Sequence, residues 1–346
     1  SEEQANELYD KLVAFSGFGF PKSHSAAFGL LAYQSAWLRH HHPREFLCAL
    51  LNAQPMGFYP PASLVRDAQR RGVEVRPPQI NRSAAKCALE DGAVRIGLEY
   101  VRSLGEDEAA MVVVARERGG PFSGVRELSQ RTSLDRARLE ALVASGACDV
   151  FARSRRELLW ELGLVPRTQS VPGSGGEEQQ LALPLDPTAP APALREHTPW
   201  ERMLADYRLT SLSVGVHPLS LLRPHLPEGT LSSRELAERA SGGSVAVAGM
   251  AVARQRPATA NGVVFMLLED EFGQVNLIVP PVVYERFRAL VRAEPLLLAR
   301  GKFERVGRNR NVVVRELVSL SQLARQCADD ADVFGSLPAA HHFGHR

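Results

Sequence analysis

The sequence has few lysines and cysteines and no long apolar run. No hydrophobic stretch approaches the roughly 20 residues of a membrane span, and no targeting segment is visible. Its four cysteines, which lie far apart without the paired spacing of a zinc site or a redox motif, are Cys48, Cys87, Cys148 and Cys327. The sequence therefore predicts a reducing, cytoplasmic setting, no membrane partner and no metal site of its own.

A strong net charge is also missing, because the formal charge is only +2. Four of the 41 basic residues are lysines and the rest are arginines. Arginine suits bidentate phosphate contacts and stacking on bases, but a GC-rich genome produces the same excess. The distribution is more informative: residues 244–320 hold eleven basic against seven acidic side chains, a net charge of +4.

With 346 residues, 45% of them hydrophobic and 23% charged, the chain is long enough for several folded domains. It begins with Ser1 instead of Met. A processed product and a piece of a longer protein are both compatible with that start.

One stretch, GFGFPKSHSAAF at residues 17–28, organises the N-terminal part. Two glycines and a proline interrupt the chain before an Ala/Leu-rich helix predicted to run to Arg39, so its cationic and hydroxyl side chains lie at a helix N-terminus, where backbone N–H groups favour phosphate. The predicted nucleoside triphosphate seat comprises Lys22, Ser23, His24 and Phe28. The alternative is an ordinary capped helix with Phe28 in the core. Three histidines at residues 40–42 point in different directions on a helix, so a polar helix end is favoured over a metal site.

Two features follow in the middle of the chain. Residues 101–112 have the pattern of a helix-hairpin-helix turn that exposes backbone N–H groups to a DNA phosphate, with Ser103 where glycine is usual, followed by Leu104 and Gly105. A second helical pair leads into residues 144–147, which predicts a tandem arrangement; ordinary helical hairpins remain the alternative. Residues 166–192 are rich in Pro, Gly and Ser and predict a linker. Within it Gln180, Leu181 and Leu183 are a candidate sliding-clamp peptide, or simply linker leucines.

The C-terminal pattern predicts an oligonucleotide-binding (OB) barrel. Five strands are expected, at residues 244–252, 263–268, 274–279, 296–304 and 312–318, with a helix between the third and fourth. In this fold the loops after strand one and before strand five flank the binding face. Here they are basic, and the candidate DNA-binding residues are Arg254, Arg256, Arg308 and Arg310, with Phe265 and Phe303 as stacking surfaces or, alternatively, core residues. Three consecutive acids at residues 269–271 are expected to face solvent in a hairpin turn.

This order of elements resembles the C-terminal third of the bacterial C-family DNA polymerases, the polymerase III alpha type. The stretch at residues 17–28 is similar to the family's motif near the end of the fingers, and residues 93–106 to the start of its helix-hairpin-helix region. Residues 52–59 and 254–271 are closer to the error-prone, damage-tolerant branch. The expected fold is multidomain α+β, divided into distal fingers (1–78), a helix-hairpin-helix region (79–164), a linker (165–195), a helical connector (196–243), an OB barrel (244–321) and a C-terminal tail (322–346), whose last residues are expected to be unstructured.

The resemblance implies an incoming-nucleotide role for His24 and Phe28. It also implies that the palm carboxylates, which hold the two Mg²⁺ ions, lie outside this chain, so no catalytic residue is expected here and the chain alone is expected to be inactive. Expected partners are primer-template duplex, single-stranded template, dNTP, a sliding clamp and other damage-tolerance proteins. The predicted function is support of error-prone, translesion DNA synthesis; the alternative is a stand-alone single-stranded-DNA-binding or accessory protein without catalysis.

Overall fold

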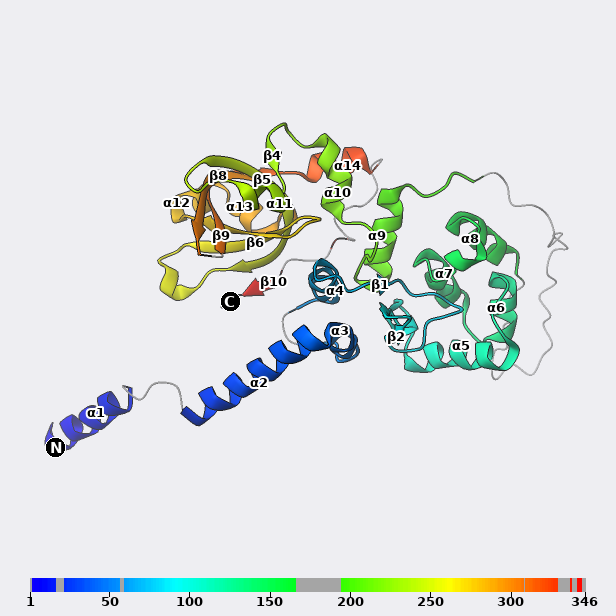
Figure 1. Cartoon of the computed structure of the whole chain (residues 1–346), viewed down its shortest axis with the longest axis horizontal. Coiled ribbons are helices and arrows are strands. Elements are labelled where there is room, and N and C mark those ends of the chain that lie inside the picture. Colours follow the sequence, from blue (N-terminus) through cyan, green and yellow to red (C-terminus); the bar gives the residue numbers. More distant parts are fainter. Residues whose placement is uncertain are drawn as a thin grey trace.

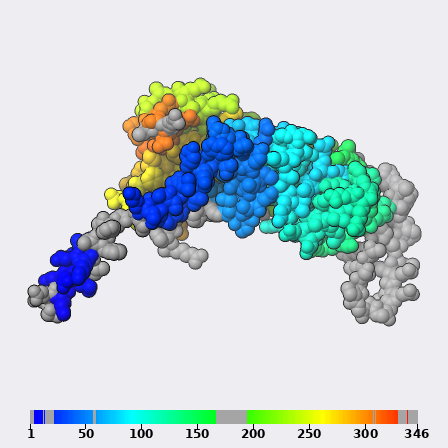
Figure 2. Space-filling model, turned by 60° about the horizontal axis from the view of Figure 1, so that its bottom comes forward, coloured from blue at the N-terminus to red at the C-terminus, as the bar shows by residue number. Residues whose placement is uncertain are grey.

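The computed structural model describes residues 2–16, 22–56, 59–165, 194–307, 309–328, 337 and 341–343. Helices α3 and α4 lie between a C-terminal barrel on one side and a helical middle part on the other (Figures 1 and 2). Among the described helices, none combines the length and the apolar character needed to cross a bilayer.

The N-terminal part is a row of four helices: α1 (Glu2–Ser16), α2 (Lys22–His41), α3 (Pro43–Asn52) and α4 (Pro61–Arg70). Prolines start α3 and α4, where the missing N–H costs no intrahelical bond. These two helices bury Leu47, Leu51 and Val65. In contrast, α2 projects from the body (Figure 1), and none of its side chains is buried.

A small sheet of order β1-β3-β2, which contacts α3, begins the middle part. The elements of this part are β1 (Val75–Arg76), β2 (Ala88–Glu90), β3 (Ala93–Arg95), η1 (Leu98–Tyr100), α5 (Glu106–Gly119), α6 (Val125–Arg131), α7 (Arg136–Ala144), η2 (Asp149–Phe151) and α8 (Arg155–Leu164). One core of their side chains, including Ile80, Leu128 and Leu142, is fully buried. The hairpins of this part are therefore held on a rigid base.

The connector then leads to the barrel through short capped elements: α9 (Pro199–Thr210), α10 (Pro218–Leu222), η3 (Arg223–His225), β4 (Thr230–Leu231) and α11 (Ser233–Glu238). A second core joins it to both neighbours, because this core includes Trp200 of α9, Leu51 of α3 and Leu298 of the barrel. The barrel is thus packed against α3, α4 and the connector instead of hanging on a free tether.

Five long strands form the predicted closed barrel: β5 (Ser244–Gln255), β6 (Val264–Glu269), β7 (Gln274–Val279), β8 (Leu296–Val306) and β9 (Asn309–Ser319). Their order β5-β6-β7-β9-β8 closes through β5–β8 pairing, with β7 and β9 parallel. The connections between β5 and β6 and between β7 and β8 carry η4 (Ala258–Ala260) and α12 (Pro281–Arg286) with α13 (Arg288–Ala293), respectively. The α+β fold with an OB-like barrel is confirmed.

The C-terminal segment differs from the expectation of an unstructured end. Helix α14 (Ser321–Cys327) packs on α10, and β10 (His341–Phe343) pairs in parallel with residues 253–255 of β5. The end of β5 still offers unpaired backbone groups on that side, which gives the final strand its partner.

Candidate nucleic-acid interface

The first turn of α2 carries the predicted phosphate seat. Lys22 is the first helical residue, and none of the residues of this turn is acidic. The ring of His24 lies 4.4 Å from that of Phe28 in an edge-on arrangement, one turn apart as expected. Phe28 is 57% exposed, so the described chain does not place it in a core. Residues 17–21 lie outside the described residues.

The first hairpin is less suited to a phosphate than its sequence suggests. Ser103 takes a left-handed φ of +75° at the position where glycine is usual, and Leu104 is buried. The N–H of Gly105 is already occupied, because it donates to Glu108 Oε2 at 2.9 Å in a capping box. Hydrogen bonds from the start of α5 lower the pKa of Glu108, so this carboxylate is ionised at neutral pH. A phosphate here would meet three acidic side chains in one turn.

The second hairpin is filled by the protein itself. Gly146 has a φ of +85°, and the guanidinium of Arg155 packs so closely against it that an added Cβ would clash. Arg155 donates to the Ala144 carbonyl at 3.0 Å and to the carboxylates of Asp149 at 3.0 Å and Asp206 at 3.1 Å. Its side chain is only 10% exposed. This hairpin ties α7, α8 and α9 together.

The barrel exposes three of its predicted residues, Arg256, Phe265 and Arg310. Strand register places Gln255, Phe265, Ile278 and Val313 in one row across β5, β6, β7 and β9. Phe265 is 39% exposed in this row. Arg256 follows Gln255 directly and lies over the Tyr284 ring at 4.6 Å, and Arg310 is exposed three residues before Val313. An exposed aromatic side chain, with exposed arginines after β5 and at the start of β9, is suited to a single strand, whose bases stack and whose phosphates need cations.

Two other barrel residues are not available to DNA. Phe303 is 0% exposed and belongs to the barrel core, which is the alternative that the sequence left open. Arg254 is not a loop residue but lies within β5, is 6% exposed, and donates to the Glu294 carbonyl. Burial lowers its pKa. Arg308 lies outside the described residues, as do the clamp-peptide candidates Gln180, Leu181 and Leu183.

The acidic hairpin between β6 and β7 does not face solvent, which corrects the expectation from sequence. Glu269 is 1% exposed and accepts hydrogen bonds from Arg70 at 3.0 Å and from Gln274 at 2.9 Å. Burial alone would raise the pKa of Glu269, but His217, Arg70 and Gln274 together hold it below the usual range. Asp270 is 4% exposed and accepts from the backbone and hydroxyl of Ser233, both at 2.6 Å. These acids join the barrel to its neighbours.

His217 completes this junction as a neutral histidine. Its Nδ1 accepts the N–H of Leu219 at 3.1 Å, so the ring proton is on Nε2, which lies 3.8 Å from Glu269 Oε1. Burial lowers the pKa of His217. Arg66 of α4 adds a further connection, because it donates to the carbonyls of Ser213 and Val216. Sequence reasoning missed this α4–connector–barrel latch, defined by Arg66, Arg70, His217 and Glu269, since its partners are up to 199 positions apart.

Comparisons with known proteins agree with this architecture. A family model described as a helix-hairpin-helix motif matches residues 72–158. The error-prone DNA polymerase of Anaeromyxobacter dehalogenans (strain 2CP-C) is 43% identical over 334 residues, covering 93% of this chain and 29% of the relative. That of Burkholderia pseudomallei (strain K96243) is 42% identical, covering 93% and 30%. The chain therefore spans less than a third of the length of these relatives, and the resemblance to the error-prone branch is confirmed.

Among solved structures, asparaginyl-tRNA synthetase from Pyrococcus horikoshii is 20% identical over 26% of this chain and 24% of its own, with a TM-score of 0.23. This overlap is too small to carry an argument.

Within the described residues no cluster of His, Cys, Asp or Glu could hold a metal ion.

Proposed function

We propose that this chain, a segment similar to error-prone DNA polymerases at 40–43% identity, serves as the part of such a polymerase that grips the single-stranded template. The observation that carries the proposal is the exposed Phe265 in the strand row of the barrel, together with the exposed Arg256 after β5 and the exposed Arg310 at the start of β9. The first turn of α2 is proposed to approach the incoming dNTP through Lys22, Ser23, His24 and Phe28. The first hairpin, Ser103 to Gly105, is a weaker candidate for duplex contact because Glu108 competes for its N–H group.

Nucleotidyl transfer is assigned to the part of the polymerase beyond this chain. Two Mg²⁺ ions held by palm carboxylates would supply the electrostatic stabilisation of the transferred phosphoryl group there. This chain contributes orientation and strand binding, and a role in damage-induced, translesion synthesis is proposed from its resemblance to the error-prone branch. Cytoplasmic location and contact with a sliding clamp through Gln180, Leu181 and Leu183 remain predictions.

The barrel row can be tested with a fluorescent dT12 oligonucleotide and binding anisotropy. We expect Phe265→Ala to weaken binding roughly 5- to 100-fold, the range for loss of one stacked base. Arg256→Ala and Arg310→Ala are each expected to lower the salt slope by about 0.7, as for one phosphate contact on a single strand. The matched control is Arg300→Ala, which removes an exposed arginine paired with Glu316 on strands β8 and β9. Salt-independent binding, or equal losses in all four variants, would contradict the proposal.

A stand-alone single-stranded-DNA-binding or accessory protein is the second candidate, and the same barrel row favours it because no catalytic group is needed for such binding. The two are separated by the intact mass of the protein in its source cells, detected with an antibody to the barrel. A band near 37.9 kDa supports the accessory protein, whereas one about three times larger supports the polymerase.

A further inference from the structure

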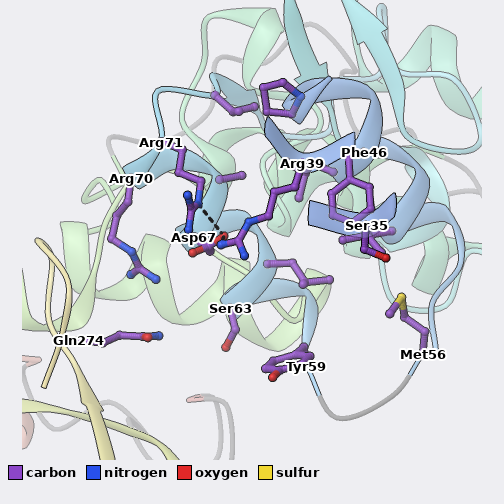
Figure 3. A pocket seen from close by; sticks show the side chains of 16 residues that line it. Ser35, Arg39, Phe46, Met56, Tyr59, Ser63, Asp67, Arg70, Arg71 and Gln274 are labelled. Atoms are coloured by element: carbon purple, nitrogen blue, oxygen red, sulfur yellow. Dashed lines mark hydrogen bonds and ion pairs between the residues drawn. The ribbon is translucent and has the colours of Figure 1, made fainter. Parts of the chain in front are cut away.

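A cleft of about 480 Å³ lies between helices α2–α4 and the edge of the barrel (Figure 3). Its volume is within the range of sites that hold a small molecule or one unit of a polymer. Side chains from three helices line one side, and Gln274 of β7 lies on the other. The cleft is thus built from two parts of the chain that the α4–connector–barrel latch holds together.

One side of the cleft has more positive charge than its carboxylate can neutralise. Asp67 accepts from Arg39 at 2.5 Å and from Arg71 at 3.2 Å, and Figure 3 shows the two guanidinium groups converging on it. The side chains of Arg39 and Arg71 are 43% and 52% exposed. Since each guanidinium has five N–H donors, both retain donors for a further anion. The third arginine, Arg70, is committed to Glu269.

Most of the remaining lining is apolar or aromatic. Phe46, Leu47, Leu50 and Met56 contribute to it, and Tyr59, which is 62% exposed, lies at the lower edge of the view in Figure 3. A ligand that satisfies both halves needs a flat apolar ring and an anionic group within a few ångströms of each other. A nucleotide has this combination, with a base for the aromatic side and a phosphate for the arginines.

The cleft also continues the outer face of the barrel. Along β6 and β7 the outward positions pair as Phe265 with Ile278, Leu267 with Asn276, and Glu269 with Gln274. Gln274, the last of this series, lines the cleft. On β7, where Gln274 and Asn276 are exposed, four residues of strand separate Gln274 from Ile278, the neighbour of Phe265, which is about 13 Å. A strand that stacks on Phe265 and follows this face therefore reaches the cleft within a few nucleotides.

We propose that the cleft binds one nucleotide of the single-stranded DNA that lies on the barrel face. Arg39 and Arg71 bind its phosphate while sharing Asp67, and Tyr59 stacks on its base. The proposal rests on the proposed function, since it requires that the barrel face holds single-stranded DNA. It adds a second anchor for the strand, on the helical side of the latch.

The first test compares dT12 binding by the full chain and its variants in a salt series. We expect Arg71→Ala and Tyr59→Ala each to weaken binding at least 5-fold, and Arg71→Ala to lower the salt slope by about 0.7. The control is again Arg300→Ala, because Arg300 and Arg71 have similar exposure, 48% and 52%, and one carboxylate partner each. Binding by Arg71→Ala and Tyr59→Ala that equals that of Arg300→Ala would overturn the proposal.

The second test locates the nucleotide without relying on affinity. A set of dT12 oligonucleotides carries 5-iodouracil at one position each, and the crosslinked peptides are identified by mass spectrometry. We expect crosslinks to Phe265 from one position and to Tyr59 from a position a few nucleotides away. Crosslinks to the barrel alone would overturn the cleft and leave the proposed function intact, whereas no crosslink to either residue would contradict both. Equal competition by duplex DNA of the same length would also overturn the single-strand assignment.

Discussion

His217 is a buried titratable side chain whose protonation is opposed by its surroundings. Among the charged groups around it, Glu269 and Glu271 favour the charged form, but burial and Arg66 oppose it, and its pKa is lowered. The unfolded chain binds a proton near the ordinary histidine pKa of about 6.5, and the folded chain binds it only at a lower pH. Stability from this residue is therefore complete above pH 6.5 and is lost as the pH falls below it.

We predict that His217→Asn removes this pH dependence. Asparagine can still accept the N–H of Leu219 as an N-cap, but it does not titrate. Between pH 7.5 and pH 5.5 the wild type should lose more unfolding free energy than the variant, because only the wild type takes up a proton on unfolding in this range. Urea unfolding followed by the fluorescence of buried Trp200 measures this difference. Parallel losses in both proteins would show that other groups dominate.

Strand β8 requires a glycine at position 301, where its backbone lies very close to that of β9. The register between β8 and β9 shifts at Gly301, and a Cβ there would lie 2.1 Å from the Val313 carbonyl oxygen. We predict that Gly301→Ala destabilises the barrel by about 1–3 kcal/mol through forced backbone movement. Thermal unfolding should show a midpoint lowered by several degrees. Gly215→Ala is the matched control, because Gly215 has open space around its Cβ position; a similar shift there would argue against the steric explanation.

The barrel shows which features could be predicted from the sequence and which could not. Alternating apolar residues predicted all five barrel strands and the helical segment before the fourth, because strand periodicity is a local property. Whether a side chain on a strand is exposed depends on how the barrel closes, which is not a local property of the sequence. The sequence therefore predicted Arg254 as an exposed loop residue, although it lies buried in β5. For Phe303 the sequence left two alternatives, a stacking surface and the core. The sequence predicted that Glu269 faces solvent, because its partner Arg70 is 199 positions away in the chain.

For the whole molecule, the arrangement of barrel and helices depends on the buried Arg70–Glu269 pair. Arg70→Ala leaves the Glu269 carboxylate without its cationic partner, which we predict costs about 3 kcal/mol of unfolding free energy. Arg71→Ala, at the C-cap of the same helix, removes a pair with the exposed Asp67 and should cost less than about 1 kcal/mol. Urea unfolding compares the two variants. Adding Glu269→Gln to Arg70→Ala should restore part of the loss, and a double variant no more stable than Arg70→Ala would count against a charge effect.

The burial of this pair has a practical consequence for solution experiments. Mobile ions screen exposed charges over about 10 Å at 0.1 M salt but act little on pairs removed from solvent. Exposed arginines such as Arg71 and Arg256 therefore sense the ionic strength, while Glu269, at 1% exposure, is shielded from it. Raising the salt concentration should release a bound polyanion while the barrel keeps its position against α4. A salt titration of this protein thus varies its affinity for nucleic acid at constant domain geometry.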